Sequence, residues 1–166
     1  MVNKFVVIIA AIVAVMAALI AIPRIGSEQN VLEEDLSIEY GRQNLTRLED
    51  GRFQATSADD LVIRNDRSAT YRSLIGGSDT KQFTTSREEL AVLKSLLFET
   101  GFMQLPGEDY SQRDGVDTVT KYRLTLTSGE NSKTVTWVNL EASDEAVPSI
   151  VRNIGAQLDQ IIERNT

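Results

Sequence analysis

Carboxylates are the main side chains in this sequence that could do chemistry, because it contains neither histidine nor cysteine. Without those residues, thiol nucleophiles, Ser-His-Asp triads and zinc sites of the usual ligands are excluded. Adjacent carboxylates occur at Asp59-Asp60, Glu88-Glu89 and Asp144-Glu145. Such pairs can act as general acid and base only when they converge, and neighbours on a strand or helix point apart. We therefore expect no catalytic residue.

A second acidic group lies in the polar segment 106–117, which contains Glu108, Asp109, Asp114 and Asp117. Carboxylate oxygens are the ligands that calcium prefers. The spacing is not that of an EF-hand loop, and no glutamate closes the segment. We expect a solvated loop and no metal site.

Two short motifs could recognise other groups. Gly76-Gly77 could approach an anion closely, but no phosphate-binding glycine pattern surrounds it, so we expect a turn and no cofactor. Asn44, with Leu45 and Thr46, forms an acceptor sequence for N-glycosylation. Asn44 is therefore a possible glycosylation site, provided that the domain meets the glycosylation machinery.

The charge distribution argues against nucleic-acid partners. All 24 acidic residues, but only 15 of the 17 basic ones, lie beyond residue 27, which gives that part a net charge of −9. An acidic surface repels the phosphate backbone. We expect no nucleic acid among the partners.

The first 26 residues have the pattern of a membrane anchor. Residues 5–22 form an unbroken apolar run of 18 residues between Lys4 and Pro23-Arg24. As a helix this run would be about 27 Å long, which is close to the thickness of the hydrocarbon core. We predict a single-pass anchor at 1–26 that contacts membrane lipid through 5–22, with the domain on the extracytoplasmic side. A cleaved signal peptide and a buried helix are the alternatives.

Small residues recur within the apolar run. Ala10, Ala14 and Ala18 are spaced four apart, as in the ridges through which membrane helices pack together. This ridge supports a second functional hypothesis, a structural accessory subunit of a membrane protein complex.

The pattern beyond the anchor predicts strands first. Segment 27–60 is predicted to be juxtamembrane and to contain the first strand or strands, since Leu36, Ile38 and Tyr40 alternate with polar residues, while 41–60 is ambiguous. Residues 61–166 are predicted to form an α+β domain. Within it, hairpins are expected at 61–74 and 122–138.

Two helices are expected to cover this sheet. Ser86 and Glu89 have the spacing of a capping box, and leucines at 90, 93, 96 and 97 follow at helical spacing. A last helix begins near Pro148 and carries an apolar stripe to Ile161. The predicted fold class is α+β, an N-terminal transmembrane helix followed by an antiparallel β-sheet covered by two α-helices.

The order of these motifs resembles a known family. The leucine stripe is followed by Gly101-Phe102 with Leu105-Pro106, by Tyr122 with Leu124 and Leu126, by Lys133 to Trp137, and by Pro148 with its helix. Over 61–162 this is similar to the emfourin-like (protealysin-inhibitor-like) family, named for an inhibitor of thermolysin-type metallopeptidases. The resemblance implies an α+β fold and peptidase inhibition through protein contact. The anchor and segment 24–60 depart from the family, and no inhibitory residue can be matched to a position here.

These observations predict a membrane-anchored, non-enzymatic extracytoplasmic domain that binds a protein partner, in the manner of a peptidase inhibitor. The accessory-subunit hypothesis is the alternative. An enzyme that uses carboxylates alone, such as a glycosidase, would need two carboxyl groups about 5–10 Å apart in a cleft. The sequence shows no such pair.

Overall fold

The computed structural model describes residues 35–76, 79–107 and 109–166. The predicted anchor, 1–26, and the juxtamembrane residues up to 34 lie outside these ranges. Among the residues described, no helix is both long and apolar enough to cross a membrane.

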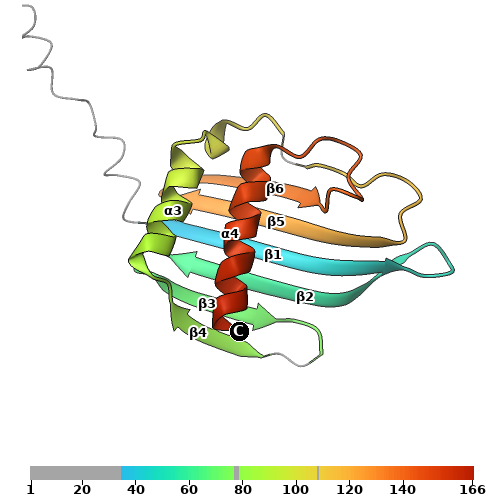
Figure 1. Ribbon diagram of the computed structural model, residues 1–166, viewed down its shortest axis with the longest axis horizontal. Helices are drawn as coiled ribbons and strands as arrows, with labels where there is room; N and C mark the ends of the chain where they lie inside the picture. The colour runs from blue at the N-terminus through green and yellow to red at the C-terminus, as the bar shows by residue number, and fades with distance from the viewer. Residues whose placement is uncertain (1–34, 77–78, 108) are drawn as a thin grey trace, which may run out of the picture. The chain divides into compact units, whose positions relative to one another are not determined.

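The described chain forms a six-stranded antiparallel sheet in the order β4-β3-β2-β1-β5-β6, with both α-helices on one face (Figure 1). The predicted combination of an antiparallel sheet and two helices is therefore confirmed. The strands are β1 (Leu36–Arg47), β2 (Phe53–Arg64), β3 (Ser68–Ser73), β4 (Thr80–Thr84), β5 (Thr118–Ser128) and β6 (Asn131–Val138). The helices are α3 (Arg87–Phe98), the short 3-10 helix η1 (Phe102–Gln104) and α4 (Ser149–Asn165).

The first strand lies in the middle of the sheet. β1 pairs with β2 on one side and with β5 on the other, so that Tyr40 lies between Leu61 and Leu124. The predicted strand at 36–40 continues to Arg47, and β2 runs across residue 60. Segment 36–60 thus supplies the centre of the sheet.

Helix α3 begins with the predicted capping box. The backbone N–H of Glu89 donates to Ser86 Oγ at 3.0 Å, and the N–H of Ser86 donates to Glu89 Oε2 at 2.9 Å. These bonds satisfy two amides that the first turn leaves unpaired. The leucines at 90, 93 and 97 are buried against the sheet.

Helix α4 follows Pro148 and crosses the strands (Figure 1). Its stripe of Val151, Ile154, Leu158 and Ile161 is buried, as its spacing predicts. A Cβ added at Gly155 would lie 2.9 Å from Cζ2 of Trp137, so the absence of a side chain there lets α4 rest directly on the indole.

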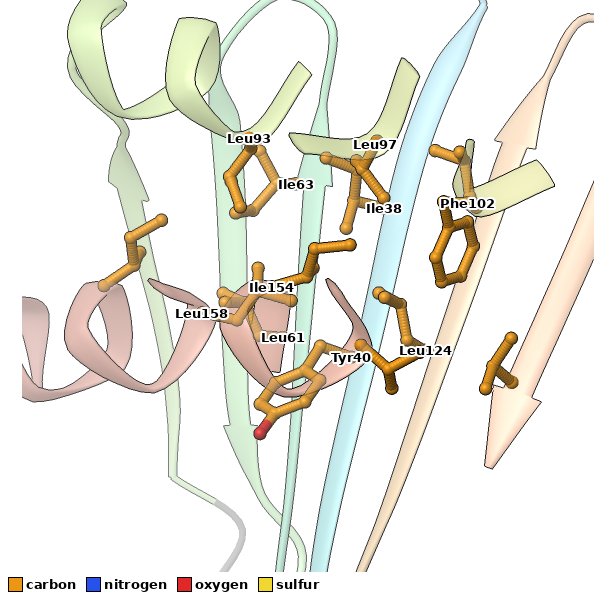
Figure 2. Packing of buried hydrophobic residues seen from close by; sticks show 14 of the residues in the cluster. Ile38, Tyr40, Leu61, Ile63, Leu93, Leu97, Phe102, Leu124, Ile154 and Leu158 are labelled. Carbon is orange, nitrogen blue, oxygen red and sulfur yellow. The ribbon is translucent and has the colours of Figure 1, made fainter. Parts of the chain in front are cut away.

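The sheet packs side chains on both faces. The main core fills the space between the strands and the helices, with Tyr40, Leu61 and Ile154 among its members (Figure 2). A smaller cluster of Val119, Val138 and Ala142 lies on the opposite face, where alternation along β6 places Val138 away from Trp137.

Candidate functional site

A groove runs beside α4 on the helix-bearing face of the sheet. It has a volume of about 370 Å³. The turn after β6 forms one wall and helix α4 forms the other. The residues that decide its character are Tyr122, Trp137, Leu140, Glu141, Arg152 and Ala156.

Stacked aromatic rings line the groove. The rings of Tyr122 and Trp137 are 5.2 Å apart at 15°, and Tyr40 stacks on Tyr122 at 6.3 Å. Trp137 is only 4% exposed because Gly155 covers it. Tyr40 is also buried, at 1% exposure, so the half-buried Tyr122 is the one of the three rings that presents part of its surface to the groove.

The rim of the groove combines an apolar and several polar side chains. Leu140 is 59% exposed, the highest value among the exposed large apolar residues of the described chain. Glu141 and Arg152 add one negative and one positive charge. An apolar side chain of a partner that enters the groove would therefore have charged groups at its rim. These groups could bind polar residues that lie next to that side chain in the partner.

A charge network centred on Arg42 meets the groove at Tyr40 and Asp159, which are among the residues that line it. Its guanidinium binds Asp59 Oδ2 at 3.0 Å and Asp159 Oδ1 at 3.1 Å. Tyrosine hydroxyls donate to the same carboxylates, Tyr71 to Asp59 at 2.9 Å and Tyr40 to Asp159 at 3.0 Å. The network joins β1, β2, β3 and α4.

Burial perturbs the acidic groups of this network. It raises the pKa of Asp159 above its usual range, against the opposing effects of the Tyr40 hydrogen bond and the Arg42 charge. Burial also raises the pKa of Tyr40, and the Asp159 charge adds to that rise. Both carboxylates are occupied by donors from within the domain, so the network fastens α4 to the sheet.

The structure separates the adjacent carboxylates that the sequence offered. Asp59 points to the helix-bearing face, whereas Asp60 points to the other face and lies 3.8 Å from Arg123. Glu89 serves the capping box while Glu88 is exposed. Asp144 and Glu145 are exposed in a turn.

The acidic segment 106–117 runs from the β6 edge to the end of the sheet where β5 begins. Asp109 accepts a hydrogen bond from the Thr136 hydroxyl, the carbonyl of Asp117 accepts one from the Arg47 amide, and Asp114 is exposed. Glu108 lies outside the described residues, as does Gly77. Among the residues described, no cluster of three acidic side chains is placed to hold a metal ion.

Asn44 lies on β1 with an exposed side chain that is hydrogen-bonded on both sides. Its Nδ2 donates to Ser57 Oγ at 2.7 Å, and its Oδ1 accepts from Thr120 Oγ1 at 2.8 Å. A glycan on Nδ2 would replace one of its two hydrogens, so the bond to Ser57 would have to be made by the hydrogen that remains. Glycosylation of Asn44 stays a prediction.

Sequence reasoning missed Arg42 and Asp159, which are 117 positions apart. A partial signal was present, because Arg42 continues the alternation of Ile38 and Tyr40 and so had to lie on the same face as the core. Asp159 directly follows the buried Leu158 at the border of its stripe. Neither signal identifies the partner.

Comparison with protein-family models gave no match, and comparison with curated protein sequences gave none either. The resemblance to the emfourin-like family rests on its motifs alone and stays a prediction.

Proposed function

We propose that this chain is a membrane-anchored, non-enzymatic extracytoplasmic domain that binds another protein, and that the groove beside α4 receives an apolar segment of that protein. The observation that carries the proposal is the position of Leu140, more than half exposed at the rim of an aromatic groove. Exposed apolar residues beside a preformed pocket are typical of protein-binding sites.

Three further apolar residues are exposed at the same end of the sheet. β1, β3 and β6 run in the same direction in this antiparallel sheet, so the turns that follow them point to the same end. β3 ends level with Arg42 and β6 ends level with Gln43, whereas β1 continues to Arg47. Leu48 follows β1, Leu74 and Ile75 follow β3, and Leu140 follows β6, with exposures from 38% to 59%.

The side chains near the groove support binding rather than catalysis. The two carboxylates that converge, Asp59 and Asp159, are bridged by Arg42 and hydrogen-bonded by tyrosines. A carboxylate held in this way is poorly placed to accept a proton from a substrate. The proposal that the partner is a peptidase draws only on the emfourin-like motifs.

The test is covalent capture of partners by the full-length protein in its native membranes, with bound proteins identified by mass spectrometry. Leu140→Asp places a charge at the rim, and Ala156→Phe fills the groove from α4. Val92→Asp is the matched control, because Val92 is 46% exposed but lies on α3.

We expect a partner that wild type and Val92→Asp retain and that both groove variants lose. Equal retention by all four proteins would refute a role for the groove. If the partner is a peptidase, its activity is then measured with and without the protein. A partner that survives both groove variants but is lost in Ala14→Phe would instead support the accessory-subunit hypothesis.

A further inference from the structure

The two edges of the sheet differ in how they are covered. At the β6 edge, segment 109–112 runs alongside, and the N–H of Tyr110 donates to the carbonyl of Thr136 at 2.9 Å. At the other edge, β4 pairs only with β3 among the residues that the structure describes. β4 therefore presents an open edge (Figure 1).

The register with β3 shows which groups face outward. Ser73 N–H donates to Asp79 O and Thr85 N–H donates to Arg67 O, each at 2.9 Å. Alternate residues bond across an antiparallel pair, so the odd-numbered residues from 79 to 85 face β3. Thr80, Gln82 and Thr84 direct three N–H and three carbonyl groups away from the sheet.

One charged side chain lies on this edge strand, and it is bound within the domain. Natural edge strands are commonly protected by a lysine or by another charge that repels an incoming strand. The single charged residue of β4 is Lys81, and its Nζ is bound to the carbonyl of Thr166 at the end of the chain. The three residues with outward backbone groups are uncharged and exposed.

We propose that β4 is the docking site for β4 of a second copy of this chain, added antiparallel about a twofold axis at Gln82. The outward residues are symmetric about Gln82, since a threonine lies two positions away on each side. In this register Thr80 faces Thr84 of the second copy, and six backbone hydrogen bonds form. Lys81 faces Phe83 of the second copy, so no like charges are directly opposed.

The proposal is independent of the groove and concerns the opposite edge of the sheet. A contact of three residue pairs is small compared with the 1,200–2,000 Å² that stable interfaces typically bury. We therefore expect a contact too weak to survive dilution, and the test has to trap it covalently in the full-length chain at the membrane.

The sequence has no cysteine, so single cysteines report the register without background. In the proposed register the two Cα atoms at position 82 lie about 5.5 Å apart, within the range of a disulfide. The two copies of residue 80 are about 14 Å apart along the strands, which is too far. Ser132→Cys, exposed on β6, is the control for random collision.

On oxidation we expect Gln82→Cys to form a covalent dimer. Thr80→Cys and Thr84→Cys are each expected to stay monomeric alone but to cross-link when mixed. Gln82→Pro removes an outward N–H, which an edge strand tolerates, and should abolish that mixed cross-link while the circular dichroism of the fold is kept.

Three results would overturn the proposal. The first is an absence of dimer with Gln82→Cys. The second is equal trapping of Ser132→Cys or of Thr80→Cys alone. The third is a cross-link from position 82 to a different protein, which would assign the edge to that protein.

Discussion

Replacing Gly155 by alanine tests the contact between α4 and the sheet. The added Cβ would lie 2.9 Å from Cζ2 of Trp137, whereas an ordinary contact begins at 3.4 Å. The indole cannot yield, because it is 4% exposed and stacked on Tyr122. Helix α4 would have to move outward by about half an ångström, taking the fully buried Ile154 and Leu158 with it.

Two opposing effects set the size of the change in the free energy of unfolding. Alanine in place of glycine within a helix is worth about 1 kcal/mol. Overpacking a core costs about 1–3 kcal/mol, and the upper half applies here because the neighbour is a rigid ring. We expect Gly155→Ala to lower the free energy of unfolding by about 1–2 kcal/mol. Ala156→Gly, at the next and exposed position, should lower it by about 1 kcal/mol through helix propensity alone.

Urea unfolding, followed by tryptophan fluorescence, is the assay. Trp137 is the only tryptophan in the sequence, so its emission reports the contact directly. Gly155→Ala should lower the midpoint and change the emission of the folded state, whereas Ala156→Gly should lower the midpoint and leave that emission unchanged. If Gly155→Ala raised the stability by about 1 kcal/mol with unchanged emission, the close packing of α4 on the indole would be wrong.

The other predictions concern stability. Ser86→Ala removes the side-chain cap of α3 and should lower the free energy of unfolding in urea by about 1 kcal/mol. Ser149→Ala is the control, because α4 begins after Pro148 without a side-chain cap, and it should change stability little. Equal effects of the two substitutions would contradict a role for the cap. Leu158→Ala should cost about 2–5 kcal/mol because its side chain is fully buried, and a smaller loss would show that α4 is loosely packed. Burial raises the pKa of Asp159 in the folded state above its unfolded value of about 3.9. As pH rises from that value through the folded-state pKa, the unfolded protein loses this proton first, so the free energy of unfolding falls. The stability of Asp159→Asn relative to wild type should therefore increase as pH rises above about 4 in parallel urea titrations, and a constant or falling difference would argue against this shift.

Where the sheet lies under the helices, the sequence predicts its elements well. Leu124 and Leu126 alternate because one face of β5 is buried, and the leucines of α3 recur because one face of that helix is buried. The capping box was predictable because its bonds are local, three residues apart.

The pattern at 41–60 is ambiguous because the strands there extend beyond this main layer. Gln54 and Thr56 are exposed and their neighbours are half-buried, so no face of this part of β2 is consistently apolar. The groove was equally hidden, because it depends on Tyr122, Trp137 and Gly155, which come together only when α4 crosses the sheet.

The central place of β1 also affects how the chain folds as it is synthesised. Strands β1 to β4 follow one another and pair in order, whereas Leu36 meets its other partner, Ser128, 92 residues later. At the usual rate of translation that interval is about 5–20 s. For this time the inner edge of β1, which later pairs with β5, has no native partner, although it lies in the middle of the finished sheet. The β1–β4 meander is thus both the first part able to fold and the template on which the last hairpin must close, and its exposed inner edge is the point at which misfolding competes with completion of the domain.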